Sequence, residues 1–342
     1  MKRKLTLGFS LVELMVAMVL GLLLSGAAIS LFITARESYR TNEALARVQE
    51  TGRYAFEILA RSLREAGGIP CGSNLPTANV LNNASTTWWA NWGKGIQGYE
   101  GDDNTFPKSF GTDSADRVSG TDAVIVWSGT GDSGVTIVDH KPNAAQFKVN
   151  TSEHGLGDGD IVMACDYHQA AIFQVTNANA SNVTIVHNTG SSVSPGNCSK
   201  GLGYPTDCTT TNGKPHTFAG GGAITKLTAH AWYVGCNGRG SCNTPAGRSL
   251  YRLRLGNRNG SNLAAAEEIV DGVWDLQLQY LTRDASGALD TQYRDATAVS
   301  DWTRVVAARL ELTTRTAENV GTDGTPLERK WYAVVNLRNR TP

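Results

Sequence analysis

The longest hydrophobic run of the chain lies at its start. Residues 9–35 are apolar or small, and Glu13 is the one charged residue among them. This run is longer than the ~20 residues that an α-helix needs to cross a bilayer. Lys2, Arg3 and Lys4 precede it, and basic flanks stay on the cytoplasmic side of a membrane. The pattern predicts a membrane-spanning helix, with the rest of the chain on the far side.

An amphipathic stretch continues this predicted helix. Residues 36–66 contain no Pro, and Gly52 is their one Gly. Apolar residues recur at helical spacing and form one stripe: Leu45, Val48, Ala55, Leu59, Leu63 and Ala66. Gly67, Gly68 and Pro70 then end the pattern. We expect one helix over residues 9–66, roughly 85 Å long at ~1.5 Å per residue, whose second half packs on a sheet.

Short apolar runs bounded by turn residues follow, and they predict strands. The expected strands are 122–127, 135–138, 145–149, 159–166, 171–176, 183–187, 223–234, 249–255, 269–280 with a bend at Gly272, 305–313 and 331–337. Because no helical segment separates them, antiparallel pairing is the default. Residues 188–222 are expected to form a loop rich in Gly, Ser, Thr and Pro.

Residues 69–120 are expected to be irregular. They contain a cluster of aromatic residues, Trp88, Trp89 and Trp92. Such a cluster in a loop could form a binding surface. More often it packs a long insertion onto its own domain, and we favour packing.

Length and charge narrow the classes of protein. The chain has 342 residues and a formal net charge of zero, which fits one or two domains. Zero net charge argues against nucleic acid as the main partner, because phosphate binding needs a basic excess. The six cysteines lie beyond the apolar run. An even number outside the cytoplasm is consistent with disulfides in an oxidising periplasm.

The spacing of the cysteines favours disulfides over a metal. Cys236 and Cys242 are too far apart for a zinc knuckle pair, and no second pair with an adjacent His follows. Our hypothesis is three disulfides: Cys71 with Cys165, Cys198 with Cys208, and Cys236 with Cys242. Six cysteines allow 15 connectivities, so spacing leaves the other pairings open.

The sequence contains no recognisable catalytic or metal-binding motif. The histidines are scattered without a metal-binding spacing, and each is interpreted as a surface or strand residue: His140, His154, His168, His187, His216 and His230. The Gly-Asp segments match neither an EF-hand nor a nucleophile elbow. Residues 284–290 are interpreted as a hairpin turn. We therefore expect no enzymatic activity, no metal and no cofactor.

Three interpretations of the first run compete. A cleaved secretory signal has an apolar region of ~7–15 residues and a small-residue cleavage site, but this run is about twice as long and no clear Ala-x-Ala ends it. A plain signal anchor explains the length and the orientation. It leaves Glu13 unexplained, although a carboxylate in an apolar span costs on the order of 2–3 kcal/mol.

The third interpretation accounts for the acid. A basic leader ending at Gly8, followed by Phe9-Ser-Leu-Val-Glu13 and a long apolar helix, resembles a type IV prepilin signal. The resemblance implies that a prepilin peptidase cuts after Gly8 and that Phe9 becomes N-methylated. It also implies that Glu13 neutralises the terminal ammonium of a neighbouring subunit's Phe9 in a filament. Two buried opposite charges offset each other's desolvation, whereas either alone is expensive.

Segments of the second half resemble the PilW family of type IV pilus minor pilins. They are residues 268–280, 306–312 and 335–340, and the strand pair 159–166 and 171–176 fits as well. So does the end of the helix at residues 64–68, with Cys71 just after it. The resemblance covers most of the chain. It is weakest over residues 72–120 and 190–222, which we interpret as insertions.

The resemblance implies an α+β, type IV pilin-like fold in which a long N-terminal helix packs on an antiparallel β-sheet head with loop insertions. Residues 1–8 would be the leader peptide, 9–35 the transmembrane and filament-core helix, and 36–68 its amphipathic continuation. Residues 69–342 would form the β-rich head. The chain would cross the inner membrane once, with a periplasmic head, and enter the extracellular pilus.

The role implied by the resemblance is to help initiate pilus assembly and to form part of the tip complex. Its partners would be the prepilin peptidase, other minor pilins, the major pilin and, in some systems, a tip adhesin. Two alternatives stay open. One is a pseudopilin of a type II secretion system, whose heads are usually smaller. The other is a membrane-anchored periplasmic binding module that never enters a filament.

Overall fold

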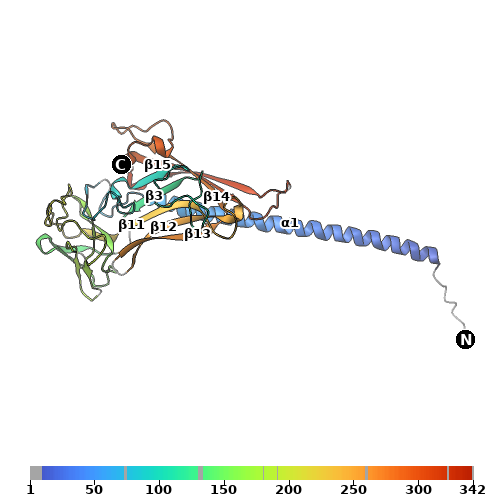
Figure 1. Cartoon of the computed structure of the whole chain (residues 1–342), viewed down its shortest axis with the longest axis horizontal. Helices are drawn as coiled ribbons and strands as arrows, with labels where there is room; N and C mark the ends of the chain where they lie inside the picture. Colours follow the sequence, from blue (N-terminus) through green and yellow to red (C-terminus); the bar gives the residue numbers. More distant parts are fainter. Residues whose placement is uncertain are drawn as a thin grey trace.

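A long helix carries a β-rich head at its carboxyl-terminal end (Figure 1). The computed structural model describes residues 10–72, 75–129, 134–179, 181–190, 192–258, 261–321 and 323–340. Helix α1 (Leu11–Glu65) has 55 residues, which corresponds to roughly 82 Å at ~1.5 Å per residue. The predicted helix is confirmed from Leu11 onward, with Ser10 and Ala66 as its two caps. Phe9 lies outside the described residues.

The strands described in the head form four sheets (Figure 1). The five-stranded sheet has the order β13 (Ser261–Asp271), β12 (Arg248–Arg258), β11 (Thr228–Cys236), β3 (Ala123–Ser128), β2 (Ile96–Tyr99). The three-stranded sheet has the order β14 (Val273–Thr282), β15 (Val305–Arg315), β16 (Glu328–Asn336). The β6 sheet has the order β1 (Thr77–Asn79), β7 (Ala170–Gln174), β6 (Ile161–Cys165), β10 (Ala223–Lys226). The β5 sheet has the order β4 (Ile137–Lys141), β5 (Gln146–Val149), β9 (Thr184–Val186), β8 (Asn177–Ala178).

Neighbouring strands within these sheets pair antiparallel, as expected, except for the parallel pair β1 and β7. Short 3-10 helices lie in the connections: Trp92–Lys94, Pro142–Ala144, Pro245–Gly247, Ala296–Ala298, Trp302–Arg304 and Arg338–Arg340. The combination of one long helix with antiparallel sheets confirms the expected α+β class.

The layers follow from the alternation of side chains along the strands. The first core cluster lies between α1 and the inner faces of the five-stranded and three-stranded sheets. Val124 and Val126 of β3 face this cluster, whereas Ile125 faces a second one. That second cluster joins the five-stranded sheet to the β6 sheet. A third cluster joins the β6 sheet to the β5 sheet, so the β5 sheet lies in the part of the head remote from α1 (Figure 1).

Three expectations about strands need correction. The single strand expected at 223–234 is two strands, β10 and β11, which belong to different sheets. The bend at Gly272 likewise separates β13 from β14, again in different sheets, and most of β13 lies before residue 269. Residues 69–120, expected to be irregular, supply the short strands β1 and β2.

The tryptophan cluster packs the insertion onto the head. Trp89 and Trp92 are buried and Trp88 is half-buried, all within the second core cluster. The indole N–H of Trp127 points at the backbone carbonyls of Trp88, at 3.0 Å, and Trp89, at 3.1 Å. The cluster therefore packs inside the head, as the favoured interpretation predicted, and does not form an exposed binding surface.

Candidate assembly site

The beginning of α1 is a reciprocal cap formed by Ser10 and Glu13. The Ser10 hydroxyl accepts the Val12 N–H at 3.3 Å, and the Glu13 carboxylate accepts the Ser10 N–H at 3.0 Å. An acid at this position also stabilises the positive end of the helix dipole. Both side chains are exposed. Gly8 and Phe9, predicted from the sequence as the processing site, lie outside the described residues.

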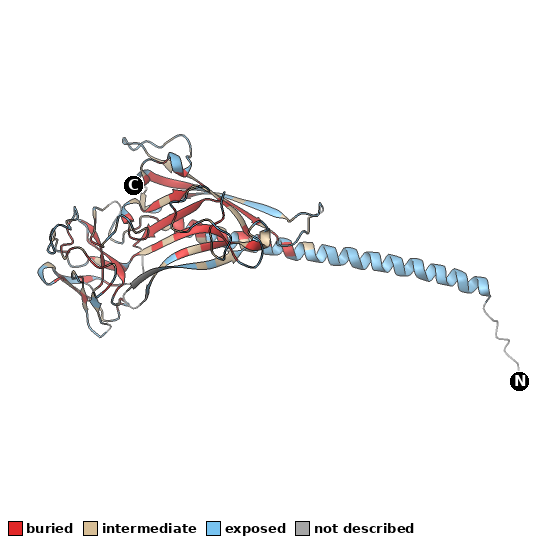
Figure 2. Ribbon diagram, viewed as in Figure 1, coloured by how far each residue is buried: buried red, intermediate tan, exposed pale blue. Residues whose placement is uncertain are grey.

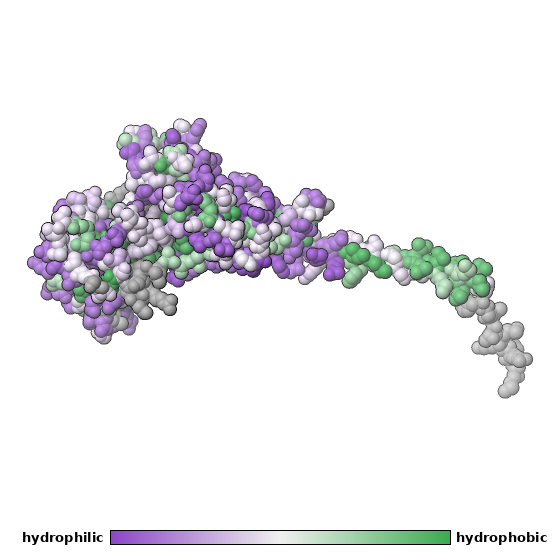
Figure 3. Space-filling view, in the orientation of Figure 1, coloured by the Kyte–Doolittle hydropathy of each residue, from purple (hydrophilic) through white to green (hydrophobic). Residues whose placement is uncertain are grey.

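The apolar half of α1, residues 11–35, makes no contact that buries it in the chain. Every residue from 11 to 40 is exposed in the chain (Figure 2), including Leu11 at 74% and Phe32 at 70%. Figure 3 shows this surface as a hydrophobic rod that projects from a mostly polar head. Among the described residues, α1 is the one helix that is long and apolar enough to cross a membrane. An exposed apolar surface of this size needs lipid or protein around it.

Glu13 is therefore a carboxylate at the start of an apolar rod. It accepts one backbone N–H through Oε2, while a carboxylate has about four acceptor positions. The cap leaves capacity for a cationic donor beside the helix terminus. In lipid or in a filament core, such a donor would offset the cost of burying the charge.

The second half of α1 is seated in the head. Val48, Ala55, Leu59, Leu63 and Ala66 of the predicted stripe are buried. The remaining member, Leu45, is 37% exposed, and Ala44 is buried in its place. The stripe thus begins one residue earlier than periodicity indicated.

Gly52 sets the closest approach between α1 and the three-stranded sheet. A Cβ atom at this position would collide with the indole ring of Trp331 in β16. The indole N–H of Trp331 donates to Thr314 Oγ1 at 3.2 Å, which holds the ring over Gly52. The single glycine of the amphipathic stretch is therefore a packing requirement.

The final turn of the chain closes over the end of the helix. The Asn339 side-chain amide lies 3.4 Å from the backbone carbonyls of Glu65 and of Ala66, which lie at the helix end that lacks intrahelical partners. Arg340 donates to the backbone carbonyls of Lys94 and Thr303. Burial lowers the pKa of Arg340 from its ordinary value. This contact gives a physical reason for the Leu-Arg-Asn-Arg ending.

The six cysteines are joined in the pairs that the sequence hypothesis named: Cys71–Cys165, Cys198–Cys208 and Cys236–Cys242. The first disulfide ties the exit of α1 to β6 across 94 positions. The second closes the loop expected at 188–222 onto itself. The third closes the turn between β11 and β12.

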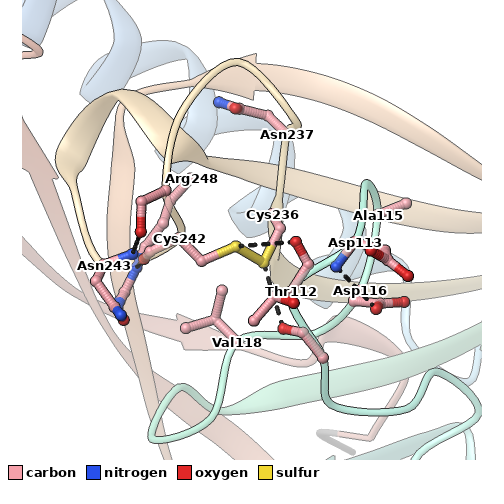
Figure 4. The surroundings of a disulfide bond; sticks show 12 residues. Thr112, Asp113, Ala115, Asp116, Val118, Cys236, Asn237, Cys242, Asn243 and Arg248 are labelled. Atoms are coloured by element: carbon pink, nitrogen blue, oxygen red, sulfur yellow. Dashed lines mark hydrogen bonds between the residues drawn. A yellow bond between two sulfur atoms is a disulfide. The ribbon is translucent and has the colours of Figure 1, made fainter.

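The Cys236–Cys242 disulfide is held from both sides (Figure 4). Cys236 Sγ lies 3.4 Å from the carbonyl oxygen of Gly111. Arg248 donates to the Cys242 carbonyl at 2.6 Å and to the Trp274 carbonyl at 2.9 Å, and its guanidinium stacks on the Trp274 ring. The disulfide loop is thus attached to β14, which lies beside α1.

Two histidines that the sequence left unconnected meet in the core beside the β5 sheet. His140 and His187 are buried, and their Nε2 atoms are 3.1 Å apart. Phe218 N–H donates to His140 Nδ1 at 3.2 Å, so the His140 proton sits on Nε2 and points at His187 Nε2. Burial lowers the pKa of His140 to about 4 and that of His187 to about 3. Both rings are neutral parts of an aromatic core.

The other histidines do not join this pair in a metal site. His216 lies against Asp166 at 3.1 Å, His154 is buried, and burial lowers the pKa of His230 in β11 to about 4. Within the described residues, no three His, Cys, Asp or Glu side chains lie close enough to bind one metal ion. The expected turn at 284–290 is present, with Asp284 N–H donating to the Ala288 carbonyl at 2.9 Å.

Two buried charged residues, Arg117 and Asp122, were also missed by sequence reasoning. Arg117 donates to the backbone carbonyls of Glu100 at 2.6 Å and Thr121 at 2.9 Å, and burial lowers its pKa to about 10. Asp122 accepts the Leu278 N–H at 2.8 Å, and burial raises its pKa to about 7. The Asp122 contact joins the start of β3 in the five-stranded sheet to β14 in the three-stranded sheet. A lone Arg and Asp in a loop give no sequence signal for such a role.

Comparison with known families gives two matches. A prokaryotic N-terminal methylation motif matches residues 3–29, which cover the Glu13 cap and most of the exposed apolar rod. The model of type IV pilus-assembly protein W matches residues 231–338, from β11 to the final turn. No curated protein and no solved structure is significantly similar to the chain.

A methylation motif on a bare apolar helix, seated in an antiparallel head, supports the class of membrane-anchored type IV pilins. The second match, over the strands that pack on α1, points to the pilus-assembly protein W family within this class. Together, the two matches support a type IV pilin of the PilW family.

Proposed function

We propose that this PilW-family pilin is a minor pilin that helps initiate pilus assembly and forms part of the tip complex. The observation that carries the proposal is Glu13, a capped carboxylate at the base of an exposed apolar rod. The match to a pilus-assembly family supports it. Its partners are other minor pilins and the major pilin.

In this proposal, processing prepares the rod for assembly. Prepilin peptidase removes residues 1–8 by cutting after Gly8, and Phe9 is then N-methylated. Residues 9–35 hold the chain in the inner membrane, with the head in the periplasm. The methylation motif found at residues 3–29 supports this step.

Glu13 then guides the entry of the rod into a filament. A carboxylate left alone in an apolar span costs on the order of 2–3 kcal/mol. The amino-terminal ammonium of a neighbouring subunit's Phe9 offsets that cost when the two helices lie side by side. Correct axial register places the charges together, so misaligned subunits are disfavoured.

Two variants at one position separate the charge from the cap. Glu13→Gln keeps an acceptor for the Ser10 N–H, because Gln also serves in a capping box, but it removes the charge. Glu13→Ala removes both. Glu37→Ala, an exposed acid of α1 beyond the apolar run, is the control. The amount of each variant is measured in membranes and in sheared pili.

We expect wild-type levels of all three variants in membranes. Glu13→Gln and Glu13→Ala should both be lost from sheared pili, whereas Glu37→Ala is retained. If Glu13→Gln enters pili like the wild type, the charge-pairing mechanism is wrong. If the wild-type chain itself never copurifies with pili, the minor-pilin proposal is wrong.

A further inference from the structure

Strand β16 is the outer strand of the three-stranded sheet. Its hydrogen bonds to β15 determine which of its backbone groups face outward from the sheet. Leu337 N–H donates to the Val306 carbonyl, and Thr316 N–H donates to the Leu327 carbonyl. The register between these two bonds is constant, so hydrogen-bonded pairs alternate along it. The odd-numbered residues of β16 bond to β15. The backbone groups of residues 328, 330, 332, 334 and 336 therefore point away from the sheet.

This edge lacks the usual protection against pairing with another chain. Natural edge strands are blunted by shortness, Pro, bulges or charges. β16 has nine residues, no Pro, and no charge from 331 to 335, and its pairing with β15 has no register shift. By contrast, the β13 edge is interrupted by a register shift against β12.

The remaining sheet edges in the described residues are covered or short. The outer edge of β14 is covered by Asp122, which donates to the Leu276 carbonyl and accepts the Leu278 N–H. The end strands β1, β2, β4, β8 and β10 have between two and five residues. β16 is thus the one long, straight edge of the described part that stays unprotected.

The solvent face of β16 has an apolar centre between charged ends. Tyr332 and Val334 are 63% and 54% exposed. Lys330 pairs with Glu311 at 2.9 Å, and Glu328 pairs with Arg315 at 2.6 Å. Because these charges are satisfied within the sheet, a second strand laid along the edge would meet mainly Tyr332 and Val334.

The position of β16 beside α1 indicates which partner would lie along its outer edge. The opposite face of the strand packs on the helix through Trp331. The β15–β16 connection reaches along α1 toward its exposed half (Figure 1), where Thr41 Oγ1 donates to the Val320 carbonyl at 3.4 Å. A hollow of about 680 Å³ lies between these two segments. A subunit whose helix lies alongside α1 would bring its head against this edge.

We propose that β16 accepts an extended strand from the head of a neighbouring pilus subunit, which pairs with the outward backbone groups of residues 328–336. This inference rests on the proposed function. The occupant is a strand with β-branched or aromatic residues opposite Tyr332 and Val334. Backbone pairing supplies the contact, and these two side chains supply its selectivity.

Photocrosslinking of the full-length chain in assembled pili tests the inference. Tyr332 is replaced by p-benzoylphenylalanine, and Tyr167, which is 72% exposed at the β6–β7 turn, is replaced in a control. We expect a covalent adduct with another pilus subunit from position 332, at least tenfold stronger than from 167. The adduct should disappear in a Glu13→Gln background.

Two substitutions then test backbone pairing in the chain labelled at 332. Val334→Pro removes an outward N–H that the sheet does not use, and Val334→Lys places a charge at the apolar centre. Val138→Lys, at an exposed valine of β4, is the matched control. We expect both changes at 334 to reduce the adduct at least tenfold and Val138→Lys to leave it unchanged, with equal chain levels in membranes.

The outcomes separate the two proposals. A labelled chain that enters pili without forming the adduct, or an adduct that survives both changes at Val334, overturns the strand inference and leaves the minor-pilin role intact. A labelled chain and a wild-type chain that both fail to enter pili overturn the proposed function and the inference with it, whereas equal entry with Glu13→Gln contradicts the charge-pairing mechanism.

Discussion

Gly52 shows how one residue fixes the fit of the helix to the head. The Trp331 ring occupies the space that any side chain at position 52 would need. Inserting extra carbons into a well-packed core costs about 1–3 kcal/mol, because side chains must leave their preferred rotamers. The glycine therefore stabilises the docking of α1 although it weakens the helix on its own.

Gly52→Val should lower the free energy of unfolding by about 2 kcal/mol through this overpacking. Gly26→Val is the matched control, because nothing lies within 4 Å of a Cβ at Gly26. Thermal unfolding of the detergent-solubilised chain, followed by circular dichroism, measures both. Equal melting temperatures for the two variants would contradict the packing role of Gly52.

The buried histidine pair makes the distal part of the head sensitive to acid. His140 and His187 have lower pKa values when folded than the ordinary 6.5, mainly through burial. The unfolded chain thus binds more protons at mildly acidic pH, so stability is full above about pH 6.5 and falls as the pH drops toward 4. For His140, the neighbouring His216 also lowers the pKa, whereas Asp139 raises it. For His187, Lys200 also lowers the pKa.

Hydrogen exchange at different pH values checks this expectation. After correction for intrinsic rates, the amides of β5 and β9 should lose protection between pH 7 and pH 4.5, while those of β15 change less. The double variant His140→Phe/His187→Phe should be less stable at pH 7 and should show a flatter dependence on pH. An equally steep loss in that variant would mean that other groups control the effect.

At the scale of elements, periodicity predicted α1 and most strands. It failed where a strand changes sheets, because residues 223–234 keep their alternation while β10 ends at Lys226 and β11 begins at Thr228. It also missed most of β13, whose Ala- and Glu-rich sequence has low strand propensity and is a strand because β12 pairs with it. Local sequence does not predict such long-range pairing.

The candidate site was more predictable than the head. Glu13 was evident from sequence because an acid inside an apolar run is rare. Its bond to the Ser10 N–H follows from local capping chemistry. By contrast, His140 and His187 lie 47 positions apart, and only the pairing of three strands brings them together. The free edge of β16 likewise depends on where the sheet ends.

The three disulfides should contribute unequally to stability. Loop-closure entropy grows with the number of residues enclosed, so Cys71–Cys165 should contribute about 4–5 kcal/mol and Cys236–Cys242 about 2 kcal/mol. Paired Cys→Ala variants of each, unfolded by denaturant in detergent, measure the difference. A larger loss for the Cys236–Cys242 pair than for the Cys71–Cys165 pair would contradict an entropic role.

At the scale of the whole molecule, the chain has two parts with opposite surfaces. The head is mostly polar and is stabilised by core clusters between successive layers. The rod is apolar and bare over residues 11–35. An apolar rod beside a polar head is stable where lipid or a bundle of similar helices surrounds the rod and water surrounds the head.

Mass spectrometry of the membrane-extracted chain tests the pilin mechanism most directly. We predict an amino terminus at N-methylated Phe9, with residues 1–8 removed. A Gly8 substitution should leave the leader attached and increase the mass accordingly. An intact Met1 in the wild-type chain, or an amino terminus beyond Ala27, would contradict the mechanism, because no freed ammonium would then lie near the apolar rod to meet Glu13.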